Sequence, residues 1–283
     1  MTGSGPRRAS WRTRGLPGPD ARIGLGVFFW RERINPAGTD FGVEWAITNR
    51  RGGSSQPPFE EFNLAGHVGE LPESVETNRH RLAHELGLRV ADLRLMDQRH
   101  GCNVALTPGT RGEGVTGEGG PVPAVDGLVS GRTDEALVVL VADCAPVLLF
   151  DRTEGLVAAV HAGRPGMVAG VVPATLEWLR TLGASHLEAV VGPSICPRCY
   201  EVPEAMRDAA AAVEPASASV SWTGTPAVDV AAGVVAQLAR EGVAVRWLPG
   251  CTREDPDLYS YRRDGQTGRF AGVVRLLAPE QVA

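Results

Sequence analysis

The sequence predicts one α/β or α+β domain, and three observations support this prediction. Short runs rich in Val and Leu, each of strand length, alternate with longer segments of helical pattern. The 283 residues are 43% hydrophobic and 22% charged, a balance typical of a globular chain with a sizeable core. No internal repeat with a period of about 20 to 50 residues is visible. A mixed architecture, with strands covered by helices, follows from these features.

The chain begins with residues 1–20, which combine Gly, Pro, Ser and four arginines without hydrophobic periodicity. This composition predicts a disordered tail, so that residues 21–283 form the single domain. Strand-like runs follow at Ile23–Trp30 and Gly42–Thr48. A loop rich in Gly, Ser and Pro, Arg51–Pro58, comes next.

The segment Pro72–Leu86 predicts the first helix. Its proline stands at an early position, and Glu73 lies near the positive end of the helix dipole. Gly87 provides a stop signal. Further along, the stretch Thr107–Gly120 contains six glycines and predicts a mobile loop or lid.

The central region predicts three consecutive strands of one buried sheet, at Leu137–Ala142, Val147–Phe150 and Leu156–His161. A helix over Gly166–Leu182 should follow and kink or restart at Pro173, because proline lacks the N–H that a helix interior requires. The remaining predicted elements are a strand at Ala189–Val191, helices at Pro203–Val213 and Val228–Arg240, and strands at Ala244–Trp247 and Phe270–Leu277.

The cationic residues of this chain are all arginines, and none is a lysine. This excludes Schiff-base catalysis, pyridoxal phosphate attachment and a P-loop, because each needs a lysine amine. The net charge of −5 provides no general attraction to nucleic acid or to an anionic membrane. A local arginine site for a single phosphate is still compatible with this composition.

The compartment predicted from the sequence is a reducing cytoplasm. The five cysteines are odd in number, and the N-terminal segment lacks the apolar run of a secretory signal, even though Arg7 and Arg8 are adjacent. No apolar stretch approaches the roughly 18–20 residues needed to cross a bilayer. We therefore expect neither a membrane span nor an anchor.

Cys144 and His161 form the first candidate site pair. The runs that contain them are expected to pair as a hairpin with Phe150 opposite Leu156. This register places Ala145 opposite His161, and Cys144 follows one step further along its strand. Paired residues have Cβ atoms about 4.5–5.5 Å apart, so the thiol and the imidazole should be neighbours where the strands end.

A Cys–His pair fits two kinds of chemistry, a nucleophile with its base or two ligands of a zinc ion. His100, in the segment Asp-Gln-Arg-His-Gly, is the candidate for a third ligand, since Gly101 lets the backbone turn tightly there. Two histidines and one cysteine leave a fourth position open, as in a catalytic zinc site. His80 and His84 lie one helical turn apart and are expected to be solvated.

Two further segments carry candidate residues. Cys196-Pro-Arg-Cys199 has the spacing of a redox or zinc motif, but without a second Cys-x-x-Cys we interpret it as two partly buried thiols. The segment Tyr259–Arg269 concentrates arginines, tyrosines and glycines before the final strand. Arginine guanidinium groups can bind a phosphate, and tyrosine rings can stack on a base or a sugar. A charged surface hairpin explains the pattern equally well.

Several short motifs occur together in a specific order, and together they resemble the laccase-domain family over roughly residues 20–278. That family is also described as multicopper polyphenol oxidase-like, as peptidoglycan editing factor and as purine nucleoside phosphorylase. The motifs are Asn63-Leu-Ala-Gly-His-Val-Gly69, Asn78-Arg79, Gln98-Arg-His-Gly101, Asp126-Gly127, Ala142-Asp-Cys144, Val160-His-Ala-Gly163, Gly192-Pro-Ser-Ile195, Cys199-Tyr-Glu-Val202 and Ser260-Tyr-Arg-Arg-Asp-Gly265.

The resemblance implies a zinc ion held by His100, Cys144 and His161, the trio that the spacing also indicates. It implies phosphorolysis of adenosine, inosine, guanosine and methylthioadenosine, together with adenosine deamination. The implied fold is a layered α/β sandwich of mixed sheets flanked by helices, related to the cysteine deamidase toxins. The implied partners are purine nucleosides and phosphate, without nucleic acid or membrane, in a monomer or homodimer.

Two departures from the family pattern stand out. Many relatives have Trp-Arg after His-Ala-Gly, where this chain has Arg164-Pro165. Relatives often have adjacent cysteines before Tyr-Glu-Val, where this chain has Cys196-Pro-Arg-Cys199. The reach of Arg164 and any role of Cys196 are therefore open.

The sequence assigns His100, Cys144 and His161 to metal binding and catalysis. The other candidate residues are assigned to substrate or phosphate binding, namely Asn63, His67, Arg79, Arg262 and Arg263. The alternative is a Cys–His hydrolase or amidase of peptidoglycan with Cys144 as nucleophile. A copper oxidase is less favoured, because six histidines without a His-x-His pair are too few for a blue-copper site and a trinuclear cluster.

Overall fold

The computed structural model of the chain describes residues 26–36, 39, 41–111 and 124–278. The tail predicted at residues 1–20 lies outside the described residues. Most of the predicted glycine-rich loop also lies outside them, since the description ends at Arg111 and resumes at residue 124.

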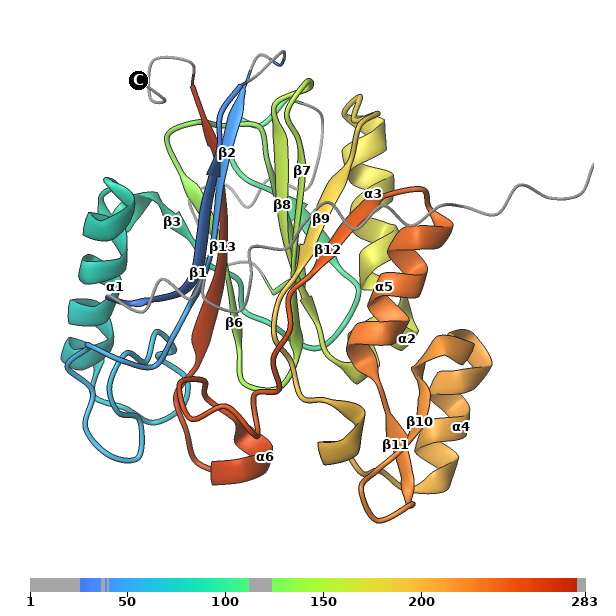
Figure 1. The fold of residues 1–283 in the computed structure, drawn as a ribbon. Coiled ribbons are helices and arrows are strands. Elements are labelled where there is room, and N and C mark those ends of the chain that lie inside the picture. The colour runs from blue at the N-terminus through green and yellow to red at the C-terminus, as the bar shows by residue number, and fades with distance from the viewer. Residues whose placement is uncertain (1–25, 37–38, 40, 112–123, 279–283) are drawn as a thin grey trace, which may run out of the picture.

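Two sheets face each other at the centre of the molecule (Figure 1). The five-stranded sheet has the order β1 (Phe28–Ile34), β2 (Gly42–Thr48), β13 (Phe270–Leu277), β6 (Ala136–Val141) and β3 (Leu93–Arg94). The six-stranded sheet has the order β12 (Ala244–Trp247), β9 (Glu188–Val191), β7 (Ala145–Asp151), β8 (Leu156–Ala162), β5 (Gly127–Ser130) and β4 (Val104–Leu106). Each sheet contains both parallel and antiparallel pairs.

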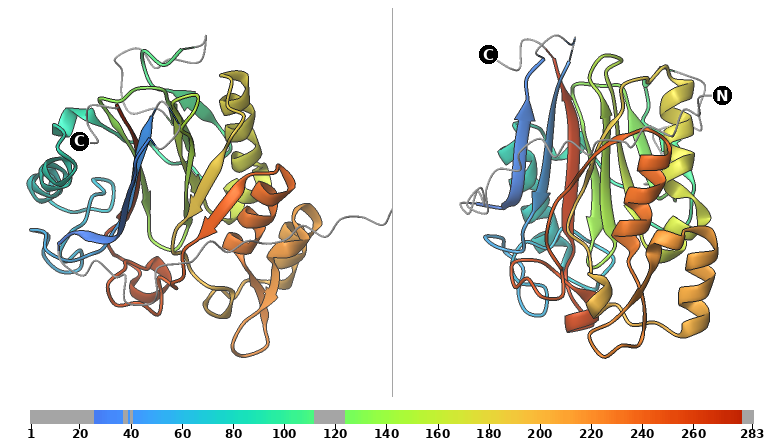
Figure 2. Two further views of the ribbon diagram at one scale, coloured as in Figure 1. Left: turned by 45° about the horizontal axis from the view of Figure 1, so that its top comes forward. Right: turned by 45° about the vertical axis from the view of Figure 1, so that its right-hand side comes forward.

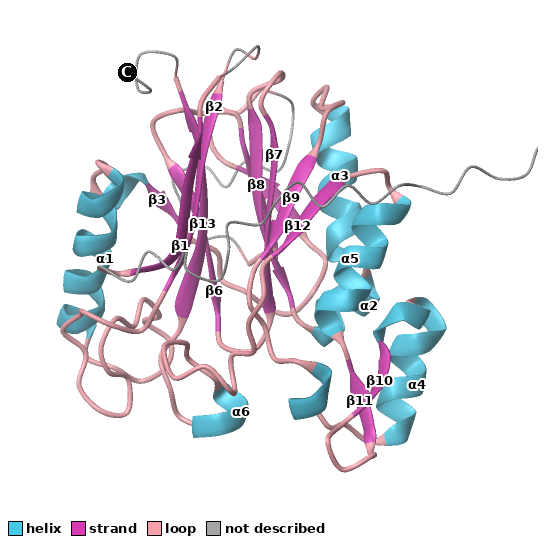
Figure 3. Ribbon diagram, in the orientation of Figure 1, coloured by secondary structure: helices cyan, strands magenta, loops and turns pink. Residues whose placement is uncertain are grey.

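Helices cover the two outer faces, so that the molecule has four layers (Figure 2). The helix α1 (Pro72–Leu86) lies on the five-stranded sheet. The helices α2 (Arg164–Ala169), α3 (Val171–Thr181) and α5 (Val230–Arg240) lie on the six-stranded sheet. Below them, α4 (Glu204–Val213) packs beside the hairpin of β10 (Ala218–Val220) and β11 (Pro226–Val228) (Figure 3).

Short helical turns complete the chain: η1 (Val90–Asp92), η2 (Pro197–Cys199), η3 (Pro215–Ser217) and α6 (Tyr261–Asp264). The turn α6 lies at the end of the two sheets that is lowest in Figure 1. This end carries the site described below.

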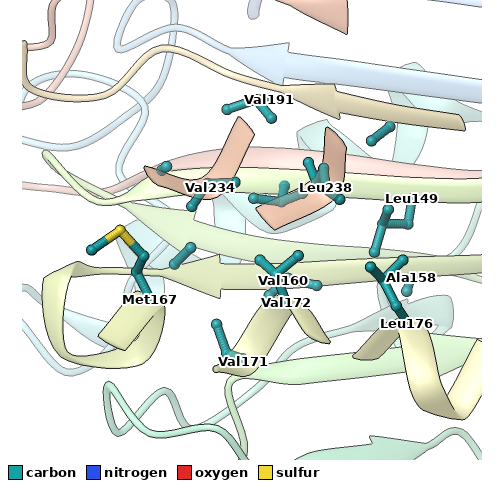
Figure 4. Packing of buried hydrophobic residues seen from close by; sticks show 14 of the residues in the cluster. Leu149, Ala158, Val160, Met167, Val171, Val172, Leu176, Val191, Val234 and Leu238 are labelled. Carbon is teal, nitrogen blue, oxygen red and sulfur yellow. The ribbon is translucent and has the colours of Figure 1, made fainter. Parts of the chain in front are cut away.

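Three apolar clusters hold the layers together. One lies between the sheets and includes Trp45 and Leu148, and a second lies under α1 and includes Leu82. The third packs side chains of α3 and α5, such as Leu176 and Leu238, on the outer face of the six-stranded sheet (Figure 4). Strands that are buried on both faces read as continuous apolar runs, which is why their positions are visible in the sequence.

The predicted fold class is confirmed, and several predicted elements match the structure at both ends, including Gly42–Thr48, Pro72–Leu86 and Phe270–Leu277. The first strand was misplaced, because β1 begins at Phe28 and runs to Ile34. Its last residues carry Arg and Glu side chains that pair with β2, and such an edge strand lacks the apolar run used to find it.

The prediction of three consecutive strands in one sheet was wrong. The strand β6 belongs to the five-stranded sheet, whereas β7 and β8 belong to the six-stranded sheet. All three strands are buried on both faces, so their composition could not show which sheet each one joins.

The predicted helix over Gly166–Leu182 is interrupted, but at Gly170 and not at Pro173. Gly170 has φ 86° and separates α2 from α3. Pro173 lies in the first turn of α3, where backbone N–H groups have no intrahelical acceptor, so the proline removes no helix hydrogen bond there. The glycine takes the left-handed conformation that ends a helix.

Candidate active site

Asp126, the residue before β5, organises one side of the site. Its carboxylate accepts hydrogen bonds from the backbone N–H groups of Arg99, His100 and Gly101 at 3.1, 2.9 and 2.7 Å. His100 has a positive φ of 60°, a conformation that a residue with a side chain adopts only when its surroundings hold it. The carboxylate therefore fixes the loop that presents the His100 ring.

Cys144 lies on the short crossover from β6 to β7, where the chain passes from one sheet to the other. The neighbouring Asp143 has φ 96° and ties this crossover to two distant segments. Its carboxylate accepts hydrogen bonds from Thr252 Oγ1 at 2.6 Å and from the Arg262 N–H at 2.7 Å. Its backbone carbonyl accepts one from the Ile195 N–H at 2.9 Å. The role that the structure gives Asp143 is to hold the thiol in place.

His161 lies near the end of β8, where its side chain is 3% exposed. Its Nδ1 lies 2.7 Å from the Asp126 carboxylate. This contact directs the other ring nitrogen toward Cys144 and His100, and such a carboxylate–histidine pair is typical of metal ligands. One carboxylate thus orients both histidines.

The hairpin register differs by one residue from the prediction. His161 pairs with Pro146, and Leu156 pairs with Asp151 in place of Phe150. The Cys144 thiol and the His161 imidazole are nevertheless close, as predicted. The observed register, continued by one residue, places Cys144 opposite Gly163, which is two residues from His161. A one-residue shift in register moves every side chain to the other face, and turn composition alone did not fix it here.

The three side chains form one compact cluster. The ligand atoms of His100, Cys144 and His161 all lie within 4.8 Å of one another, with Cys144 Sγ 3.8 Å from His100 Nε2. The ring centroids of the two histidines are 4.6 Å apart, at an interplanar angle of 75°. Gly163 makes this approach possible, since a Cβ at that position would lie 2.9 Å from His100 Cδ2 and 3.0 Å from Cys144 Sγ.

The cluster stabilises a Cys144 thiolate. Burial opposes ionisation, but the charge of His161 and hydrogen bonds with both histidines lower the pKa of Cys144 to about 6. Burial likewise disfavours a charged His161, yet Cys144 and Asp126 raise the pKa of His161 to about 9. A thiolate is the form of cysteine that binds metals and attacks electrophiles.

A cavity of about 420 Å³ opens at this cluster. Three arginines, Arg164, Arg262 and Arg269, line it together with the cluster and His67. The Arg164 Nε is buried without a hydrogen-bond partner among the described residues. Burial lowers the pKa of Arg269, whose guanidinium also bonds the Thr267 and Gly268 carbonyls. Arg164 and Arg269 are half-buried and Arg262 is exposed. Guanidinium groups that line one cavity are suited to an anion such as phosphate.

The predicted binding residues divide into two groups. His67 and Arg262 line the cavity. Burial and the charge of Arg269 lower the pKa of His67, which favours its neutral form. The guanidinium of Arg262 lies 5.0 Å from the centre of the Tyr200 ring, another cavity-lining side chain.

The second group supports the walls without lining the cavity. Asn63 is buried and accepts a hydrogen bond from the Arg269 N–H at 2.8 Å, and Arg79 Nε bonds the Leu64 carbonyl at 3.0 Å. Arg263 bonds the carbonyls of Thr252 and Leu258. These three predicted residues are therefore placed as structural supports.

Sequence reasoning missed Asp126 and Arg269 as individual site residues. Arg269 belongs to the arginine-rich segment that was singled out, but its position just before β13 was the only signal that it faces inward. The same segment contains Tyr259, which is fully buried and donates to the Phe59 carbonyl at 2.6 Å, and Tyr261, which lines the cavity.

The fold and the site define a class of protein: two facing sheets with a Cys/His₂ cluster at one end of both, opening into an arginine-lined cavity. The chain belongs to the multi-copper polyphenol oxidoreductase laccase family, whose family model matches residues 44–277. The resemblance seen in the sequence motifs is thereby confirmed.

Relatives and solved structures agree with this assignment. The chain is 50% identical over 238 residues to a Streptomyces coelicolor protein named purine nucleoside phosphorylase. The matched region covers 83% of this chain and 96% of that protein. It is 44% identical over 235 residues to a Mycobacterium tuberculosis protein of the same name. The matched region covers 82% of this chain and 91% of that protein. A Neisseria meningitidis crystal structure matches with TM-score 0.74 and 32% identity, covering 88% of this chain and 99% of that one. A Geobacillus stearothermophilus structure, YlmD, matches with TM-score 0.73 and 29% identity, covering 83% and 92%.

Within the part of the chain that the structure describes, no helix is both long and apolar enough to span a membrane.

Proposed function

We propose that this chain is a zinc-dependent purine nucleoside phosphorylase. The observation that carries the proposal is the joint placement of a Cys/His₂ donor set and three cavity-lining arginines at one end of the two sheets. The names of its relatives point to the same activity. We extend the proposal to adenosine, inosine, guanosine and methylthioadenosine as substrates, in a cytoplasmic protein.

The donor set fits zinc. One thiolate and two imidazoles are typical zinc ligands, and three protein ligands leave a position for a substrate. A blue-copper site would add a weak axial methionine or glutamine to the same trio. No methionine is among the described residues that line the cavity, and the amide of the cavity-lining Gln98 bonds the Leu140 backbone at both ends. The fixed orientation of His161 by Asp126 further favours a permanent ion.

Phosphorolysis joins a phosphate oxygen to C1′ of the ribose and breaks the bond from C1′ to the purine. The bond electrons leave with the base, and the products are ribose 1-phosphate and the free purine. Arg164, Arg262 and Arg269 would bind and orient the phosphate, and the cavity-lining Tyr200 and Tyr261 would contact the purine. A bound zinc ion would supply Lewis-acid stabilisation of developing negative charge.

We also propose adenosine deamination in the same cavity, in which a water oxygen bonds to C6 of the adenine, the bond from C6 to the amino nitrogen breaks, and the products are ammonia and inosine. The support is the position left open by the three-residue donor set beside the cavity. One experiment tests both reactions. Purified protein is incubated with adenosine, with and without phosphate, and the products are separated chromatographically.

Adenine with ribose 1-phosphate, formed only when phosphate is present, is the expected result for the phosphorylase, and inosine is expected for the deaminase. Cys144→Ala should abolish both activities, whereas Cys102→Ala, a partly buried thiol outside the cluster, should retain them. Full activity of Cys144→Ala would contradict the zinc site.

A second candidate function has a specific observation in its favour. Asp126, His161 and Cys144 stand in the order of an acid, a base and a nucleophile, and the low pKa of Cys144 suits a thiolate that attacks amides. A peptidoglycan amidase would be active without metal and would be inactivated by iodoacetamide. Stoichiometric zinc that protects Cys144 from alkylation would eliminate this alternative.

A further inference from the structure

A second cluster of metal-binding side chains lies outside the cavity. It consists of Cys196, Cys199, Cys251 and Glu254, whose four ligand atoms all lie within 4.8 Å of one another. None of the four lines the cavity. Sequence reasoning treated the first two as partly buried thiols, because it found no second pair with matching spacing.

The tertiary structure supplies that second pair. Cys251-Thr-Arg-Glu254 repeats the spacing of Cys196-Pro-Arg-Cys199, with a carboxylate in place of the last thiol. A parallel bridge between Ser194 and Cys251 brings the two segments together, and the Thr252 N–H donates to the Ser194 carbonyl at 3.1 Å.

Each half is a tight turn that presents its two end residues. The Cys199 N–H donates to the Cys196 carbonyl at 3.0 Å, and the Glu254 N–H donates to the Cys251 carbonyl at 3.1 Å. The Cys196 N–H also donates to Cys251 Sγ at 3.3 Å. This N–H links the two turns directly through one of the four ligand atoms.

The chemistry of the cluster fits a cation better than a simple thiol core. Cys199 Sγ lies 3.2 Å and Cys196 Sγ 3.8 Å from the same Glu254 oxygen, so a carboxylate meets two thiols. Tetrahedral zinc, with bonds of about 2.3 Å to sulfur and about 2.1 Å to oxygen, places a sulfur and an oxygen ligand about 3.6 Å apart, which lies between these two distances. Cys199 and Cys251 are buried beside Ile195.

We infer that Cys196, Cys199, Cys251 and Glu254 bind a second zinc ion with a structural role. Four protein ligands close the coordination sphere, which distinguishes it from the three-ligand cluster in the cavity. The ion would join Ser194–Tyr200 to the segment around Thr252. Ile195 and Tyr200 line the cavity, and Thr252 bonds Asp143, so this ion would hold one wall of the active site.

The test is the zinc content of the purified full chain by inductively coupled plasma mass spectrometry. Cys199→Ser should contain one zinc fewer per chain than the wild type, and Cys102→Ser, the matched control, should contain the same amount as the wild type. Cys144→Ser should keep the ion that Cys199→Ser loses. This readout is independent of enzymatic activity, so failure of the proposed function and failure of the second site are distinguishable.

An unchanged zinc content in Cys199→Ser would overturn the inference. A disulfide among Cys196, Cys199 and Cys251 in freshly purified wild type, detected by intact mass, would overturn it as well. Variants of Glu254 test the site if Cys199→Ser fails to fold. Glu254→Cys, with four thiolates, should release zinc to a chelator more slowly than the wild type, and Glu254→Gln more quickly; equal rates in all three proteins would also overturn it.

Discussion

At the residue scale, one carboxylate and one glycine allow His100, Cys144 and His161 to come together. Asp126 serves as acceptor for three backbone N–H groups and for His161, so a single carboxylate sets the positions of two predicted ligands. Gly163 has ordinary backbone angles, φ −79° and ψ 172°. Its requirement for glycine therefore comes from the space taken by His100 and Cys144, and not from backbone conformation.

Gly163→Ala should weaken metal binding while the protein stays folded. The added methyl group would press on the His100 ring and on Cys144 Sγ, and the rigid ends of both side chains leave little room to adjust. We expect a fall in zinc affinity of at least about 10-fold, as for other disturbances of ligand orientation. Competition with a chromophoric chelator measures it. Zinc affinity equal to that of the wild type would show that the ligands do not meet at this position.

Arg269→Gln should weaken the use of phosphate. Loss of a charge-assisted hydrogen bond costs about 1.5–3 kcal/mol, equivalent to about 10- to 100-fold in kcat/KM for phosphate. Steady-state phosphorolysis at varied phosphate measures this ratio. Arg207→Gln, on the surface of α4, is the control and should leave it unchanged. If Arg269→Gln behaves like the control, the phosphate lies elsewhere.

At the element scale, the edge of the five-stranded sheet is held by a buried ionic cluster. Glu44 on β2 lies directly opposite Arg33 on β1 and Arg275 on β13. Arg31 also pairs with this carboxylate, with its Nη2 2.6 Å from Glu44 Oε1. Burial would raise the pKa of Glu44, but the hydrogen bonds and charges of these arginines outweigh it and hold that pKa below its ordinary 4.5.

Glu44→Gln should destabilise the fold by about 3–5 kcal/mol at pH 7, because Arg275 is buried and would lose its anionic partner. The pKa of Glu44 is lower in the folded state, so its stabilisation is full above the unfolded value and is lost as pH falls through the folded value. The difference between variant and wild type should therefore shrink below about pH 4.5. Urea unfolding across pH measures it, with the exposed Glu204→Gln as control. A pH-independent difference would argue against the ionic origin.

At the scale of the whole molecule, the site is built from segments that lie far apart in the sequence. The loop before β4, the crossover from β6 to β7, the end of β8 and the segment before β13 converge at one end of the two sheets. The two sheets supply different parts, and the crossover that carries Cys144 connects them. A ligand in this cavity therefore contacts several layers at once.

Binding of adenosine should raise the melting temperature of the whole chain. A ligand at about 100 times its Kd contributes about 2.7 kcal/mol, which corresponds to roughly 5–10 °C for a domain of this size. Differential scanning fluorimetry measures the shift. Uridine at the same concentration is the control and should have a smaller effect; equal shifts with both nucleosides would contradict a purine site.

The sequence by itself determined the fold class and the approximate position of the central strands, because buried strands carry continuous apolar runs. It also singled out His100, Cys144 and His161 as a predicted metal trio, because they lie at or beyond strand ends. It did not determine the sheet that β6 joins, the hairpin register or the break at Gly170, since these depend on packing partners that local composition does not encode. Only the tertiary structure separated the cavity-lining Arg262 and Arg269 from the supporting Arg79 and Arg263. It alone also brought Cys251 and Glu254 to Cys196 and Cys199, because about fifty residues of chain separate the two halves and only the folded sheets place them side by side.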